Sequence, residues 1–247
     1  MNAHINLHSG GQFVSLDQLA NAHLPIATPT YTPVGHFDFV ELVKQSLIRT
    51  GYAVNDEQHA LHNQRYFGIM NLESPYSDRT TTIGLRNSHD HKFPASMVVG
   101  NTVFVCSNLA FNGEVKFTRR HTTHIMRDLP YLIDSRISKI HDFEISQEHR
   151  VNSYKNQEMS IKDIDHALMS LLRAKVFPGT TLVKILNEWT TPRHEEFREA
   201  GSTLWRFYNA CTEFMKDNLW LLPQKSFILH NVLDKFTILE GEYENCR

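Results

Sequence analysis

The sequence is poor in cysteine and has no long apolar run. Its 247 residues include three cysteines, which are far apart and odd in number. That pattern excludes a disulfide framework and is typical of a protein in the reducing cytoplasm. No apolar segment approaches the length of a membrane span, so we expect no membrane partner. The first residues have neither a cationic start nor an apolar core, and a secretory signal is not expected.

A strong net charge is also missing. The formal charge is -2, and charged residues make up 21% of the chain. No global attraction to nucleic acid or to an anionic membrane is therefore expected, and any such affinity must come from a local patch. No run of residues matches a motif of established mechanism. We therefore assign no catalytic residue and favour a role without catalysis over an enzyme.

Periodicity and turn residues predict an α+β fold. Residues 1–30 are interrupted by glycine and proline and are predicted to be a weakly structured lead-in. Residues 31–247 are predicted to be one α+β domain, with a sheet-rich part over 52–118 and a helical part over 119–240. Alternating aromatic and branched residues predict a mainly antiparallel sheet of four or five strands. A long helix then covers one face of the sheet, and a helical C-terminal half follows.

Two local signals stand out in the first half of the chain. A helix is predicted over 36–50, because apolar residues recur on one face and Gly51 follows as a C-terminal cap. Gly100-Asn101 predicts a hairpin turn, because these residue types accept the positive φ angles that a two-residue turn needs.

The second half of the chain has a helical period. An apolar stripe over 120–140 predicts the long helix, which either begins or kinks at Pro130. Ser160, with Asp163 three residues later, is a variant of the capping box and predicts a helix start. A further single helix, rich in aromatic residues, is predicted over 193–217.

The run NSHDH at residues 87–91 concentrates polar side chains, and two interpretations are open. Histidine and aspartate bind divalent metals, and a site of this kind supports phosphoester hydrolysis. The candidate metal ligands are His89, Asp90, His91 and His121. No HExxH, HxxxH or paired-carboxylate motif accompanies the run. The alternative is that its polar side chains cap a turn by bonding to the backbone.

The segment VKFTRRHTTHIMR, residues 115–127, contains four cationic residues and no acidic one. An arginine pair at a helix start binds phosphates through its fork geometry and the helix-terminal amides. Phe111, Phe117 and Tyr131 are candidates for base stacking. The candidate nucleic-acid-binding residues are Lys116, Arg119, Arg120, His121, Arg127, Asn87, His89 and Asn108. The alternative is a solvated helix start with local ion pairs.

Four segments, in this order, resemble a known family: LRNSHD, VFVCSN, RHT and LWRFYNACTEFMK. Over roughly Pro29 to Asp217 the chain resembles the phage- and plasmid-encoded family catalogued as domain of unknown function 932. That family often has a glycine where this chain has His91, and here Arg119 precedes the basic tripeptide. The resemblance implies a phage, prophage or plasmid setting. It transfers no catalytic residue.

The favoured function is that of a mobile-element accessory protein that binds nucleic acid, with single-stranded DNA preferred. The order of elements is similar in outline to that of phage single-strand annealing proteins. One alternative is a His/Asp metal-dependent phosphoesterase or nuclease, which would need a divalent metal; otherwise no cofactor is expected. Another is a protein-binding antagonist of a host defence system. The aromatic C-terminal helix also suits contact with a second copy of the chain, which would make a homo-oligomer.

Overall fold

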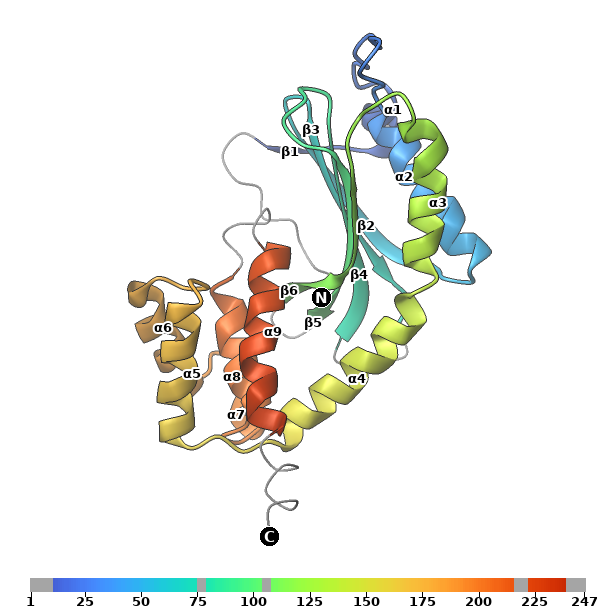
Figure 1. Ribbon diagram of the computed structural model, residues 1–247. Helices are drawn as coiled ribbons and strands as arrows, with labels where there is room; N and C mark the ends of the chain where they lie inside the picture. Colours follow the sequence, from blue (N-terminus) through green and yellow to red (C-terminus); the bar gives the residue numbers. More distant parts are fainter. Residues whose placement is uncertain (1–10, 75–78, 104–107, 216–221, 239–247) are drawn as a thin grey trace. The chain divides into compact units, whose positions relative to one another are not determined.

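A computed structural model describes residues 11–74, 79–103, 108–215 and 222–238 (Figure 1). The side chains of residues 102, 103, 108–114, 222, 223 and 238 lie outside the description. The chain divides into two compact units. The first comprises Met1–Ser107 and Phe111–Asp142, and the second comprises Asn108–Ala110 and Phe143–Arg247. The predicted division into a lead-in and one domain stays a prediction.

The first unit is built on a six-stranded sheet whose spatial order follows the chain. Its strands are β1 (Gln12–Phe13), β2 (Val54–His62), β3 (Arg65–Leu72), β4 (Arg79–Ser88), β5 (Ala95–Val103) and β6 (Asn108–Arg119). Its helices are α1 (Leu16–Ala20), α2 (His36–Arg49) and α3 (Ile125–Ile137). The predicted α+β class is confirmed. The sheet gains a strand because β1, in the predicted lead-in, pairs with the edge of β2.

The connections between strands agree only partly with the local turn signals. Asn63 has a φ of 54° in the two-residue turn between β2 and β3, and asparagine tolerates that left-handed conformation. The predicted hairpin at Gly100-Asn101 is wrong. Both residues lie inside β5, where they pair with Thr82 and Thr81 of β4. Because β5 has a neighbour on each side, its ladder hydrogen bonds outweigh the local preference for a turn.

Helices α2 and α3 pack on one face of the sheet (Figure 1). The apolar stripe of α2 fits the predicted helix over 36–50. The core between helices and sheet includes Val40, Val43, Leu47, Ile83, Leu85, Met97, Val99, Phe117, Ile125 and Leu129. Each such side chain, when fully buried, contributes about 1.5–3 kcal/mol to folding. Asp134 of α3 links the two helices, since it accepts from Ser46 Oγ at 2.5 Å and Arg49 Nη2 at 2.6 Å.

The predicted long helix is two helices. Helix α3 begins at Ile125, so it does not start at Pro130, which lies inside it. Proline in the second turn leaves the carbonyl of Met126 without its usual helical donor. Helix α3 ends at Ile137, and α4 (Ile140–Asn156) follows after two residues.

The second unit is helical. Besides most of α4 it contains α5 (Ile161–Arg173), α6 (Gly179–Thr190), α7 (Glu195–Glu199), α8 (Leu204–Glu213) and α9 (Leu222–Ile238). The predicted capping box is confirmed: Ser160 N donates to Asp163 Oδ2 at 2.9 Å, and Asp163 N donates to Ser160 Oγ at 3.3 Å. The predicted single helix over 193–217 is wrong. Gly201, with a φ of 68°, separates α7 from α8, and Thr203 then caps α8.

A buried polar group ties α4 to α9 in this unit. Tyr154 Oη donates to Asp234 Oδ1 at 2.6 Å, and Arg150 Nε lies 3.3 Å from the same oxygen. Cys211 of α8 is fully buried, and burial raises the pKa of its thiol, so it behaves as an inert core residue. In the part of the chain that the structure describes, no helix combines the length and apolarity of a membrane span.

Candidate nucleic-acid interface

Asn87, at the end of β4, holds the start of α2. Its side chain is completely buried. Its Nδ2 donates to Val34 O at 2.8 Å and to His36 Nδ1 at 3.0 Å. Because Val34 and His36 flank the N-terminus of α2, these bonds fasten that helix to the central strand. Asn87 therefore lies in the core of the first unit, and none of its surface faces a ligand.

His89 binds the backbone of the segment between α1 and α2. Its Nδ1 lies 2.9 Å from His23 O, and its Nε2 lies 2.8 Å from Val34 O. A neutral imidazole has one N–H and can donate to only one of these carbonyls, whereas an imidazolium donates to both. The side chain is 3% exposed. His89 thus positions residues 23–34 against the end of β4 instead of lining an open groove.

Ser88 and Asp90 cap the turn that follows β4, as one of the two sequence interpretations predicts. Ser88 Oγ donates to Phe93 O at 2.8 Å and accepts from Phe93 N at 3.1 Å. Asp90 accepts from Lys92 N at 3.1 Å and from Arg65 Nε at 2.7 Å. Burial opposes ionisation of Asp90, but these donors outweigh it and lower the pKa of the carboxyl group. Bonds within the protein therefore fix the conformation of this turn without a ligand.

Two imidazoles beside His89, those of His36 and His121, are neutral because they are buried. The ring of His36 stacks on that of His89, with centroids 3.8 Å apart and planes 7° apart. Burial, followed by the charges of His89 and His121, lowers the pKa of His36 to about 3. Burial likewise lowers the pKa of His121 to about 4, although the nearby backbone of Thr32 acts in the opposite direction. Near neutral pH both rings therefore carry no charge.

A pocket of about 460 Å³ lies beside this turn, within the first unit. Its lining includes Tyr31, His91, Lys92, Phe93, Arg120 and His121. We call it the Tyr31 pocket. Lys92 and Arg120 are exposed and form no ion pair with the described side chains, and none of the described acidic residues lines the pocket. The pocket therefore combines two free cations with several rings.

The rings of the pocket are held in place from both sides. Tyr31 has ring-centroid distances of 3.9 Å to His91 and 5.6 Å to His121. Phe93 packs 5.9 Å from Phe67 of β3, and the guanidinium of Arg86 lies 5.6 Å from its ring centre. The backbone also joins the walls, because Thr32 N donates to His121 O at 3.2 Å. These contacts leave a preformed surface for a planar group.

In the predicted basic cluster, two of the four cationic residues, Arg119 and Arg127, form ion pairs with Asp128. Arg119 Nη2 lies 2.8 Å from Asp128 Oδ2, and Arg127 Nη2 lies 2.9 Å from Asp128 Oδ1. Arg119 and then Arg127 lower the pKa of Asp128, which stays ionised and neutralises much of their charge. Lys116 in β6 and Arg120 directly after its end are both exposed. The side chain of Asn108 lies outside the described residues.

The four candidate metal ligands do not form a metal centre. Among the described residues, no group of three or more His, Cys, Asp or Glu side chains is placed to hold a metal ion. Asp90 is paired with Arg65, and both ring nitrogens of His89 face carbonyl oxygens. His91 and His121 both line the Tyr31 pocket, but the other two candidates do not complete a ligand set with them.

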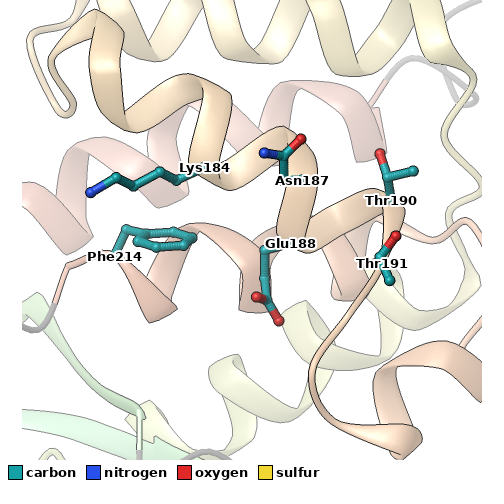
Figure 2. Close-up of a pocket in the computed structure, with 6 residues that line it drawn as sticks. All are labelled: Lys184, Asn187, Glu188, Thr190, Thr191 and Phe214. Atoms are coloured by element: carbon teal, nitrogen blue, oxygen red, sulfur yellow. The ribbon is translucent and has the colours of Figure 1, made fainter.

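A second pocket, of about 400 Å³, lies in the helical unit (Figure 2). Lys184, Asn187 and Glu188 of α6 and Phe214 after α8 line it. The carboxylate of Glu188 accepts from Arg193 N at 2.9 Å and from Arg193 Nε at 2.6 Å. Because that carboxylate is already paired, the described lining residues include no buried polar group that awaits a ligand.

Sequence reasoning missed three residues of the Tyr31 pocket: Tyr31, Lys92 and Phe93. Tyr31 lies in a turn without periodicity, where Thr28 N donates to Tyr31 O at 2.8 Å. Of the rings proposed for stacking, Phe117 packs in the core with its centroid 6.3 Å from that of Phe39. Tyr131 is 74% exposed, and the side chain of Phe111 lies outside the described residues. One sequence signal could have found Lys92 and Phe93: they directly follow the run NSHDH, which was already a candidate site.

Residues 24–219 match the family described as Domain of unknown function (DUF932). The chain belongs to this family. No curated protein and no solved structure gave a significant match. In this member of the domain of unknown function 932 family, one of the four segments that carry the resemblance, RHT, lines the Tyr31 pocket, and another, LRNSHD, ends immediately before it. LRNSHD leads into the loop with His91, and RHT supplies Arg120 and His121.

Proposed function

We propose that the protein binds single-stranded nucleic acid, preferably DNA, through the Tyr31 pocket. The observation that supports this best is the lining of the pocket: two unpaired cations, Lys92 and Arg120, lie beside aromatic rings, with no acidic side chain among the described lining residues. Single strands are held by this combination, since cations follow the phosphates and rings stack on the exposed bases.

Electrostatics favours Lys92 and Arg120 over the other candidates. The formal charge of -2 gives no general attraction, so binding depends on cations that are locally free. Arg119 and Arg127 share the carboxylate of Asp128, which weakens their field at a phosphate. Arg120 has no such partner among the described residues, and Lys116 extends the free positive charge along β6. A bound single strand of nucleic acid would then run from the pocket toward Lys116.

The biological role is an accessory one on a mobile element, such as a phage, prophage or plasmid. The domain of unknown function 932 resemblance motivates this setting, and the absence of a catalytic motif in the sequence motivates a role without catalysis. A protein of this kind would bind exposed single strands, as annealing proteins do. This part of the proposal rests on analogy and not on geometry.

Fluorescence anisotropy tests the proposal with labelled single-stranded DNA, duplex DNA and RNA across a salt series. The variant is Lys92→Gln/Arg120→Gln. We expect wild type to prefer single-stranded DNA and to lose affinity as salt rises. The variant should bind at least about tenfold more weakly, and its salt slope should be smaller by about 1.4, because two phosphate contacts are lost.

Arg119→Gln/Arg127→Gln is the matched control, since it removes the same charge from the paired cations nearby. We expect it to lose less than about threefold in affinity. If both variants lost the same affinity, the Tyr31 pocket would not be the binding site. If wild type bound none of the strands at low salt, the proposed function itself would be wrong.

A further inference from the structure

The Tyr31 pocket contains buried polar atoms without partners. Tyr31 and His121 are each 7% exposed, and both line the pocket. Within the described part of the chain, the Tyr31 hydroxyl has no hydrogen-bond partner. Neither ring nitrogen of His121 has a well-formed hydrogen bond there, although the backbone of Thr32 lies close enough to raise the pKa of the ring. Buried polar groups are nearly always paired, so unpaired ones call for a ligand or bound water. Two such side chains at one pocket indicate a place where a polar ligand binds.

His91 covers this place with its ring. It is exposed, it belongs to the turn after β4, and its φ of 60° is left-handed. Its ring centre is 3.9 Å from that of Tyr31, and the two ring planes are tilted by 46°, so the rings are in direct contact. No described side chain forms a hydrogen bond with the His91 ring. A second planar ring could therefore replace that of His91 over Tyr31.

We infer that the Tyr31 pocket receives one nucleobase, which stacks on Tyr31 and bonds to its hydroxyl and to the ring of His121. The inference rests on the proposed function and adds that the site reads the base. A hydroxyl donates and accepts, and a neutral imidazole offers one donor and one acceptor, so together they match the mixed edge of a base. The volume of about 460 Å³ suits a small ligand of this size.

The cations complete the arrangement. Lys92 and Arg120 lie at the same pocket and would hold the phosphates on either side of the inserted base. They contribute affinity that does not depend on sequence, whereas Tyr31 and His121 contribute the difference between bases. The two contributions can therefore be separated by experiment.

The test measures the binding of four strands: the homopolymers of dA, dC and dT, and an abasic strand. Each strand is measured with the wild-type protein and with the Tyr31→Phe variant. We expect wild type to bind one homopolymer at least about tenfold more tightly than the abasic strand and the least favoured homopolymer. Tyr31→Phe keeps the ring and removes only the hydroxyl. It should reduce that preference about tenfold and leave the salt slope unchanged.

Tyr131→Phe is the matched control, because Tyr131 is 74% exposed and lies outside the Tyr31 pocket; it should preserve the preference. The melting temperature of Tyr31→Phe should not fall, since the hydroxyl has no partner among the described residues. Equal binding of all homopolymers and the abasic strand by wild type would overturn the inference, as would an unchanged preference in Tyr31→Phe. Strands would still bind in either case, so the proposed function is judged separately by the Lys92→Gln/Arg120→Gln variant.

Discussion

At the scale of single residues, neighbours in the sequence have different roles. Arg119 and Arg120 are adjacent, yet the first is paired with Asp128, whereas the second lines the Tyr31 pocket and forms no ion pair with the described side chains. Both residues are arginines, so the residue type does not predict which one is paired. The pairing depends on the turn after β6, which brings Asp128 of α3 to Arg119. The same holds for His89 and His91, of which one is buried and the other exposed.

Asn87 offers a prediction at this scale. Asn87→Ala removes donors to Val34 O and His36 Nδ1 in a fully buried position. We expect the free energy of unfolding to fall by about 2 kcal/mol, because the buried His36 Nδ1 loses its partner and Val34 O keeps only the neighbouring ring of His89. Urea denaturation followed by circular dichroism measures it. Asn187→Ala, at an exposed site of α6, is the control and should change stability by less than about 0.5 kcal/mol. A similar small effect at Asn87 would show that it does not clamp α2.

At the scale of elements, periodicity predicted helices better than turns. The stripe of α2 and the Ser160 capping box depend on residues within a few positions, and both agree with the structure. The Gly100-Asn101 turn and the helix over 193–217 were wrong for different reasons. Gly100-Asn101 forms no turn because both residues pair with strand β4. The helix over 193–217 is interrupted because Gly201 has a left-handed conformation, which the prediction did not consider.

Gly68 in β3 gives a prediction about an element. A Cβ at this position would lie 2.0 Å from Tyr66 Oη and 2.8 Å from Tyr66 Cζ. The Tyr66 ring is fully buried and bonds to His59 Nδ1 at 2.9 Å, so it has little room to move. Gly68→Ala should therefore lower the free energy of unfolding by about 2–3 kcal/mol.

The control for this change is Gly179→Ala in α6. A Cβ there meets nothing within 4 Å, and the residue does not have positive φ. It should be neutral or stabilise by up to about 1 kcal/mol, since alanine restricts the unfolded chain. Both values come from chemical denaturation of the purified variants. Equal stability of the two variants would mean that Tyr66 shifts without cost.

At the scale of the whole molecule, buried histidines make stability depend on pH. His36 and His121 in the first unit have pKa values lowered to about 3 and about 4, and that of His230 in the second is lowered to about 3. Burial is the main cause for each. In the unfolded chain these groups titrate near 6.5, so between these values the unfolded state binds more protons than the folded one.

The free energy of unfolding should therefore decrease as pH falls below about 6.5, by up to about 1.4 kcal/mol per pH unit for each of these histidines. Carboxyl groups with lowered pKa, such as Asp90 and Asp134, lose their contribution only at more acidic pH. Urea denaturation at about pH 7 and about pH 5 measures the difference. His121→Gln should make the dependence shallower. Equal stability at both pH values would contradict the prediction.

The sequence by itself determined the α+β class, helix α2 and the capped start of α5. Hydrophobic period and caps act over a few residues, so they can be read locally. Only the tertiary structure decided which polar side chains are available. It buried Asn87 and His89, and it brought Tyr31 to Lys92 and Arg120. The physical reason is that burial and pairing depend on segments far apart in the chain, which meet only when the sheet and helices pack.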